Sequence, residues 1–221
     1  MIISPKTITI LKNFQSINKS IVLRPGTTIK TMNTTKTVFA TAEVEDVFSS
    51  VVPIYDLQKF LGVLSLSKED AEIEFGNQNM IIRQGSSEIK YAYCAENLIQ
   101  SPPPNKNIKM GKIDVSFELK SDVWQLVSNA MNVLGFTEFA FVGKDGKLSI
   151  QTLSTKNESS DTFSRELGKT NLTFKTILDA EKMKLIPDDY TVEITSKGLS
   201  HFKGSTVEYW IAISTKSEFG E

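Results

Sequence analysis

The chain has 221 residues, with 25 basic side chains, 26 acidic side chains and a formal net charge of −1. Its single cysteine excludes an intramolecular disulfide, and one cysteine with one histidine cannot supply the three or four ligands of a zinc site. The near-zero charge argues against a uniformly basic nucleic-acid-binding protein and against a polybasic membrane protein. No run approaches the ~18 apolar residues of a membrane helix, and no signal peptide is recognisable, so we expect a soluble intracellular protein.

The first half of the chain predicts two helices and several strands. Ser4 as N-cap and Pro5 at the first helical position indicate a helix start. Ile10, Phe14 and Ile17 then recur at helical spacing. After this helix we expect a strand pair over 21–29, a short helix over 56–64, and strands near 71–75, 80–84 and 88–93.

The clearest break in the chain is the segment 98–107, which contains three consecutive prolines. A proline run favours an extended path and excludes a helix or a central strand, as in a semi-rigid linker. The sequence therefore predicts an N-terminal domain over 1–97, an interdomain linker over 98–107 and a C-terminal domain over 108–221.

The second half repeats the order of elements of the first. Ser121 is the expected N-cap of a helix in which Val127 and Met131 belong to an apolar stripe. Further elements are expected as a strand pair over 139–150, a short helix over 177–183, and strands near 190–195, 199–203 and 207–214. Together the halves predict an α+β protein of two similar domains, each with two helices packed on antiparallel sheets.

Two acidic clusters are the main candidates for metal chemistry. Glu43, Glu45 and Asp46 form one, and the other lies at Glu69, Asp70, Glu72 and Glu74. Paired carboxylates could hold Mg²⁺ in a metal-dependent nuclease, in which Asp70 and Glu72 would be essential. However, the acids at 72 and 74 alternate with apolar residues, as on the solvated face of a strand. Neither His201 nor Cys94 has partners in the sequence that complete a catalytic set.

The polar face of the first helix differs from the rest of this slightly acidic chain. It carries no acid and consists of Thr9, Lys12, Asn13, Ser16 and Lys19. Such a face suits sequence-independent contact with DNA phosphates. An ordinary solvated helix face is the alternative interpretation.

Two runs resemble the DNA polymerase sliding clamp of T-even-type tailed phages. They are Leu11-Lys-Asn-Phe-x-x-Ile-Asn18, and Ile54-Tyr-Asp-Leu-x-x-Phe-Leu-Gly-Val-Leu-Ser-Leu66 followed by Asp70-Ala-Glu-Ile73. The resemblance implies the DNA-clamp fold and a homotrimeric ring that encircles duplex DNA and gives the replicative polymerase its processivity. It implies no catalytic activity, no metal and no cofactor. A β-rich adaptor protein unrelated to DNA is a further alternative to the clamp.

Within the resemblance, the lysines near the four expected helices are the candidate DNA-facing residues. They are Lys6, Lys12, Lys19, Lys59, Lys120, Lys182 and Lys184. The third helix departs from a basic lining, because its polar face contains Asp122 and otherwise neutral residues such as Gln125 and Asn129. We therefore expect a weakly charged pore.

The resemblance also implies partners. These are the phage DNA polymerase, an ATP-dependent clamp loader, late-transcription factors and two further copies of the chain, with no membrane, in the cytoplasm of the infected bacterium. The candidate docking residues for partner peptides are Leu98, Ile99, Pro103, Tyr209 and Trp210, with core packing as the alternative for Trp210. The strand over 88–93 is expected to pair with the strand over 162–167 of the next subunit.

Overall fold

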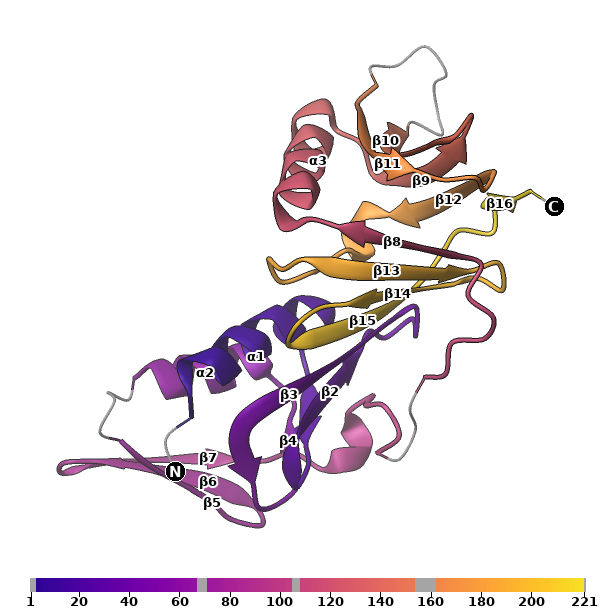
Figure 1. The fold of residues 1–221 in the computed structure, drawn as a ribbon. Coiled ribbons are helices and arrows are strands. Elements are labelled where there is room, and N and C mark those ends of the chain that lie inside the picture. The colour runs from indigo at the N-terminus through magenta and orange to yellow at the C-terminus, as the bar shows by residue number, and fades with distance from the viewer. Residues whose placement is uncertain (1–2, 67–70, 105–107, 154–161, 221) are drawn as a thin grey trace. The chain divides into compact units, whose positions relative to one another are not determined.

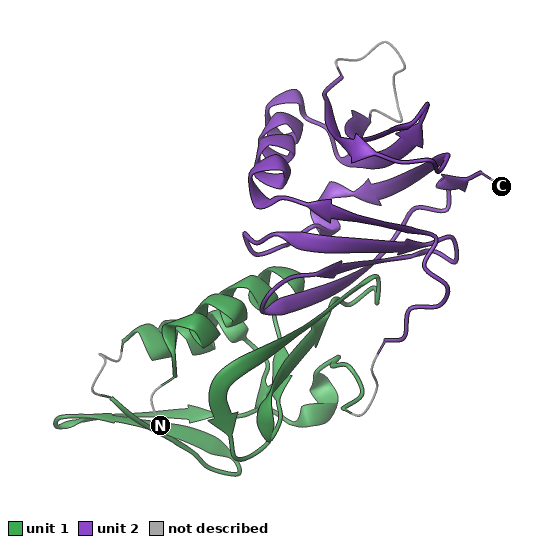
Figure 2. Cartoon of the chain, in the orientation of Figure 1, with its two compact units in different colours: residues 1–107 green, residues 108–221 purple. Residues whose placement is uncertain are grey.

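The computed structural model describes residues 3–66, 71–104, 108–153 and 162–220 (Figure 1). The chain divides into two compact units, unit 1 over residues 1–107 and unit 2 over residues 108–221 (Figure 2). Each unit has its own helices and antiparallel strands, and each is described separately below. No helix in the described ranges is long and apolar enough to cross a membrane.

Two helices of unit 1 begin where the sequence predicts them. α1 spans Pro5–Ile17, and the Ser4 side chain accepts a hydrogen bond from the Thr7 backbone N–H. α2 spans Leu57–Ser65, and Asp56 caps it by accepting from the Lys59 N–H at 2.8 Å. The end of α1 is tied to the start of α2, because the Leu57 N–H donates to the Lys19 carbonyl at 2.8 Å. The two helices therefore pack as a pair (Figure 1).

The strands of unit 1 form three antiparallel groups. β1 (Ile21–Leu23) pairs with β4 (Val52–Ile54), and β2 (Gly26–Met32) pairs with β3 (Val38–Phe48). A three-stranded sheet follows, in the order β5 (Glu72–Phe75), β6 (Asn79–Gln84) and β7 (Ser87–Ala92). After β7 comes a single 3₁₀ turn, η1 (Glu96–Leu98).

The two strands expected over 21–29 form, but the prediction that they pair with each other is wrong. β1 and β2 do not form a hairpin with each other, because each pairs with a later strand. Pro25 lies between them and has no N–H to donate to a ladder, and Gly26 has a φ of 115°, so the chain changes direction there.

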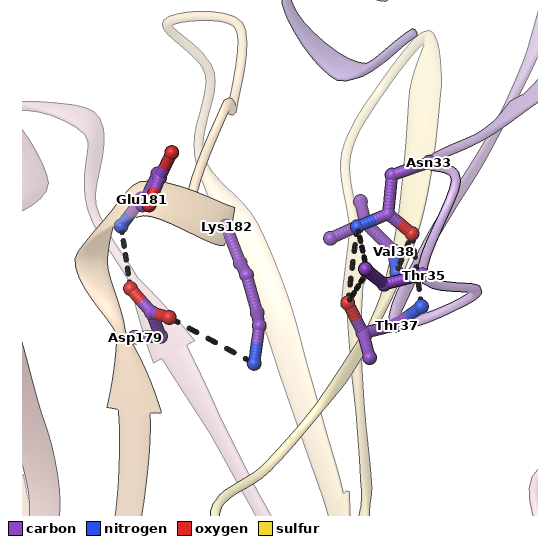
Figure 3. Close-up of polar contacts among 7 residues, drawn as sticks. All are labelled: Asn33, Thr35, Thr37, Val38, Asp179, Glu181 and Lys182. Atoms are coloured by element: carbon purple, nitrogen blue, oxygen red, sulfur yellow. Dashed lines mark hydrogen bonds and ion pairs between the residues drawn. The ribbon is translucent and has the colours of Figure 1, made fainter.

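A polar turn joins β2 to β3. The Asn33 side-chain oxygen accepts from the Thr37 N–H at 2.9 Å and from the Val38 N–H at 3.0 Å (Figure 3). Its amide nitrogen donates to the hydroxyls of Thr35 and Thr37. One side chain thus satisfies the backbone of the turn, which fixes the register of the hairpin.

Unit 2 contains a five-stranded sheet in the order β11-β10-β9-β12-β16 and a run of strands in the order β15-β14-β13-β8. The first group is β9 (Glu138–Lys144), β10 (Lys147–Leu153), β11 (Ser164–Lys169), β12 (Phe174–Asp179) and β16 (Glu218–Phe219). The second is β8 (Val115–Leu119), β13 (Tyr190–Thr195), β14 (Leu199–Lys203) and β15 (Val207–Ala212).

One α-helix, α3 (Ser121–Leu134), lies over the unit 2 sheets. Its Trp124 ring packs on Phe139 with ring centroids 5.3 Å apart, and Phe139 in turn contacts Phe141 edge to face. Phe202 and Tyr190 continue this aromatic core, with centroids 6.3 Å apart. Burial of several large rings supplies much of the apolar area of unit 2.

The expectation of two helices in each domain is wrong for unit 2. The segment expected to be helical, 177–183, begins inside β12, where Ile177 pairs in register with Ala140 of β9. Only the single 3₁₀ turn η2 (Ala180–Lys182) follows. Short apolar runs do not distinguish a strand from a helix, and here the neighbouring strand decides the outcome.

Ser121 is the first helical residue of α3, whereas the sequence predicts it as the N-cap. Lys120 occupies the cap position without a side-chain capping bond. The Ser121 N–H donates instead to Asp189 Oδ1 at 2.9 Å, so a residue distant in sequence caps the helix.

Candidate functional site

A cationic surface lies on the helix pair of unit 1. Lys6 and Lys12 lie on α1, Lys19 follows its last turn and Lys59 lies on α2, and all four side chains are exposed. We call these four residues the lysine face. It is held in place by the opposite side of α1, where Thr7, Ile10, Leu11 and Phe14 are buried. Lys6, Lys12 and Lys59 therefore project from packed helices, and Lys19 lies just after the end of α1.

The lysine face has no compensating acid on its own helices. Neither α1 nor α2 contains an aspartate or glutamate between its first and last residue. The adjacent carboxylates are used by the fold: Asp46 accepts from the Ser4 hydroxyl at 2.8 Å, and Asp56 caps α2. Within the described ranges, none of the four lysines takes part in an ion pair. Its positive charge is therefore available to an anionic partner.

The candidate lysines of unit 2, unlike the lysine face, include residues that lie beside carboxylates. Lys120 Nζ lies 2.8 Å from Asp189 Oδ2, and the hydrogen bond to this carboxylate raises the pKa of the lysine. Lys182 Nζ lies 3.9 Å from Asp179 Oδ2, while Asp179 Oδ1 accepts from the Glu181 N–H (Figure 3). Lys184, just after η2, is exposed. Lys120 and Lys182 thus each face a carboxylate.

The exposed face of α3 is nearly neutral. It presents Gln125, Asn129 and Asn132 to solvent, and Asp122 is the only charged residue of the helix. Two apolar side chains interrupt these polar ones, since Leu126 is 46% exposed and Val133 is 84% exposed. The lysine face therefore has no cationic counterpart on this helix.

The candidate docking residues separate into exposed and buried ones. Leu98 is 62% exposed and Pro103 is also exposed, whereas Ile99 is buried. Tyr209 is fully buried, with its hydroxyl accepting from the Ile186 N–H at 3.2 Å. Trp210 is buried and stacks on His201 with ring centroids 4.4 Å apart. For Trp210, burial agrees with the core-packing alternative, and the prediction for Tyr209 did not anticipate its burial.

Leu98 lines a pocket of about 600 Å³ that belongs to unit 1. Tyr55, which is 63% exposed, lies in the same lining. The remaining lining residues are polar, and Lys19 of the lysine face is one of them: Gln15, Asn18, Lys19, Ser20, Thr34, Asp56, Gln58 and Gln100. The sequence analysis missed Tyr55, although its position between the buried Ile54 and Leu57 indicates an outward side chain. A pocket lined by exposed apolar and polar side chains can bind a peptide side chain and hydrogen-bond its backbone.

The described members of the acidic clusters do not assemble into a metal site. No group of three or more potential ligand residues lies within binding range among the residues that the structure describes. Glu74 pairs with Arg83 at 2.9 Å, and Glu43 accepts from Thr28 at 2.6 Å. Glu69 and Asp70 lie outside the described residues. Glu43, Asp46 and Glu74 are thus engaged in structural contacts.

Comparisons with known proteins identify the family of this chain. A family model described as DNA polymerase processivity factor matches residues 4–100, and one described as gp45 sliding clamp, C terminal, matches residues 116–215. The sliding clamp of Enterobacteria phage T4 is 31% identical over 226 residues, covering 98% of each chain. The chain belongs to the sliding clamp family of DNA polymerase processivity factors. The sliding clamp of Vibrio phage KVP40 is 29% identical, covering 96% of this clamp and 98% of its own chain.

Solved structures show the same fold at low sequence identity. A Helicobacter pylori beta clamp bound to a DNA ligase peptide matches 97% of this clamp and 65% of its own chain, with a TM-score of 0.72 and 11% identity. PCNA of A. fulgidus, bound to the C-terminal region of FEN-1, matches 96% of both chains with a TM-score of 0.69 and 11% identity. The expected α+β clamp fold and the resemblance to T-even-type phage clamps are confirmed, and the clamp is a non-enzymatic processivity factor. The nuclease and adaptor alternatives have no support.

Proposed function

We propose that this clamp closes into a ring of three identical subunits around duplex DNA and slides along it while tethering the phage polymerase. The acid-free lysine face of unit 1 is the observation that supports DNA as the enclosed partner. Lysines that contact phosphates bind every sequence alike, as sliding requires. Only a few such contacts are useful, since each neutralised phosphate also adds salt-dependent affinity that opposes sliding. The net charge of −1 fits topological retention rather than tight binding.

The subunit contacts are proposed to form between strand edges. β7 lies at one edge of the three-stranded sheet of unit 1, and β11 lies at one edge of the five-stranded sheet of unit 2. Both strands carry mixed charges, with Glu88 and Lys90 exposed on β7 and Arg165 and Glu166 exposed on β11. Pairing β7 with β11 of the next copy would satisfy backbone groups at both edges, and a head-to-tail contact of this kind closes into a ring.

Partner docking is proposed at the pocket that contains Tyr55 and Leu98. A peptide with an aliphatic or aromatic anchor would bury its side chain against these two exposed residues, with Pro103 exposed further along the linker. The phage polymerase, an ATP-dependent clamp loader and late-transcription factors are the proposed users of this surface. All would act in the cytoplasm of the infected bacterium.

The run length of the cognate polymerase on primed circular DNA, with its clamp loader present, tests this function. We expect the clamp to lengthen the products, and Lys12→Glu to shorten them while light scattering still reports a trimer. Lys216→Glu is the matched control, because Lys216 is an exposed lysine outside the helices. Unchanged run length with the parent clamp would contradict the proposal. Loss of the trimer in Lys12→Glu would instead place this residue in a subunit contact.

A further inference from the structure

We infer that unit 1 carries the DNA backbone contacts of this clamp and that α3 of unit 2 presents a neutral wall to the same DNA. This inference rests on the proposed function, because it assumes that the clamp encloses duplex DNA. It concerns the distribution of contact within the ring. A ring of three subunits would then have three separate cationic sectors rather than a continuous cationic lining.

The DNA contacts of unit 1 would come from the lysine face. Lys6 and Lys12 lie six residues apart on α1, which corresponds to about 9 Å along the helix axis and about 120° around it, and Lys19 lies two residues beyond Ile17, the last residue of the helix. The Lys19 carbonyl accepts the first N–H of α2, so Lys59 lies two residues beyond this junction. All four lysines therefore belong to one helix pair, with Lys19 and Lys59 on the two sides of its junction.

In unit 2, two of the candidate lysines lie beside carboxylates. Lys120 Nζ is 2.8 Å from Asp189 Oδ2, and Lys182 Nζ is 3.9 Å from Asp179 Oδ2. A phosphate approaching either lysine has to compete with a carboxylate already in place. On α3 itself the single charge is the anionic Asp122, and the most exposed side chain is that of Val133. This surface neither attracts phosphates nor offers them a hydrogen-bonding cation.

A consequence for sliding follows from this division. Salt-dependent affinity grows with the number of phosphates that are neutralised, so confining the contacts to one unit of each subunit limits the total. The neutral α3 leaves room between cationic sectors in which the DNA is unbound. The duplex can then exchange one sector for the next without breaking many contacts at once.

Crosslinking from matched positions on α1 and α3 tests the inference directly. Cys94 is the only cysteine, so Cys94→Ser gives a thiol-free background. Ser16 on α1 and Asn129 on α3 are both exposed, neutral residues within a helix. Ser16→Cys and Asn129→Cys, each labelled with a benzophenone maleimide, are loaded on nicked circular duplex and irradiated. Because an uncompensated cationic face concentrates DNA, we expect about tenfold more crosslinked DNA from position 16.

Equal yields, a higher yield from position 129 or no yield from position 16 would overturn the inference. Run length with the unlabelled parent clamp is measured in parallel, and its failure to rise would count against the proposed function instead. A second comparison replaces lysines by glutamine in sets. Changing the four residues of the lysine face should weaken the salt dependence of ring diffusion on DNA, whereas changing Lys120, Lys182 and Lys184 should leave it within error. A larger effect of the second set would also overturn the inference.

Discussion

Lys120 and Asp189 form an ion pair across 69 positions of sequence, with 2.8 Å between Nζ and Oδ2. The second oxygen of the same carboxylate accepts the Ser121 N–H at 2.9 Å. Asp189 therefore caps the first turn of α3 and neutralises the lysine that precedes it. The contact also places a negative charge at the positive end of the helix dipole, where it is stabilising.

This arrangement makes the stability of the clamp pH-dependent in a defined direction. The Lys120 side chain and the Ser121 N–H hold the pKa of Asp189 below its ordinary value. A carboxyl whose pKa is depressed by folding stabilises the fold above its unfolded pKa of about 3.9, and this contribution is lost as the pH falls through the folded pKa. We expect Asp189→Asn to unfold at lower denaturant concentration than the parent at pH 7, with the difference shrinking toward pH 3.

The measurement is urea unfolding followed by circular dichroism at fixed subunit concentration, since assembly contributes to apparent stability. Glu181→Gln removes an exposed acid that forms no ion pair with any residue in the described ranges, and it serves as the control. A difference between Asp189→Asn and the parent that stays constant from pH 7 to pH 3 would contradict this account of the cap.

Two glycine substitutions should have opposite effects on stability. A Cβ at Gly143 would lie 2.5 Å from both the Leu172 carbonyl oxygen and the Phe174 ring, so Gly143→Ala should destabilise unit 2 by about 1–3 kcal/mol. A Cβ at Gly62 meets no atom within 4 Å on α2, so Gly62→Ala should stabilise unit 1 by about 0.5–1 kcal/mol. Unfolding free energies of the two variants check both signs. A stabilising Gly143→Ala would show that close approach does not explain Gly143, and a destabilising Gly62→Ala would contradict the expectation for α2.

The start of α1 depends on Ser4. Its hydroxyl oxygen accepts the Thr7 N–H at 3.2 Å and donates to Asp46 at 2.8 Å. Ser4→Ala should cost about 1–2 kcal/mol, because the Thr7 N–H loses its acceptor and Asp46 loses the hydroxyl donor, keeping only the backbone N–H of residue 4. Ser16→Ala on the exposed face of α1 is the control and should change stability by less than about 0.5 kcal/mol. Hydrogen exchange should also show faster opening of the first turn in Ser4→Ala alone.

The proposed docking pocket predicts a binding defect without a folding defect. Leu98→Asp places a charge where an apolar anchor would bind, so affinity for a clamp-binding apolar peptide of the cognate polymerase should fall by about tenfold or more. Val47→Asp is a matched control, because Val47 is 60% exposed in unit 1 and lies outside the pocket lining. Fluorescence anisotropy of a labelled peptide measures both. Equal losses in the two variants would move the docking site elsewhere.

The elements that sequence analysis predicted well are those with local signals. Ser4-Pro5 and Asp56 begin α1 and α2 as expected, and the alternating residues of 72–92 form the β5-β6-β7 sheet. The clamp fold and family, inferred from two runs in the first half, are confirmed by the comparisons. Local signals suffice because caps and periodicity act within a few residues.

Features that depend on contacts between residues distant in sequence could not be predicted from local sequence patterns. Ile177 belongs to a strand because Ala140 pairs with it, and no local pattern reveals that partner. The neutralisation of Lys120 by Asp189 and the burial of Tyr209 likewise depend on the folded sheets. The DNA-facing and docking residues stay predictions.

The spacing of the lysines on α1 has a consequence for folding in dilute buffer. Lys6 and Lys12 lie about 9 Å apart along the helix axis, close to the distance over which 0.1 M salt screens exposed charges, about 10 Å. At the ionic strength of a cell, these lysines therefore repel one another only weakly, and the helix tolerates two cations without acidic partners. At 0.01 M salt the screening length rises to about 30 Å, and the same charges act on each other along the whole of α1. Unit 1 should accordingly be the salt-sensitive half of the clamp, melting first as ionic strength falls.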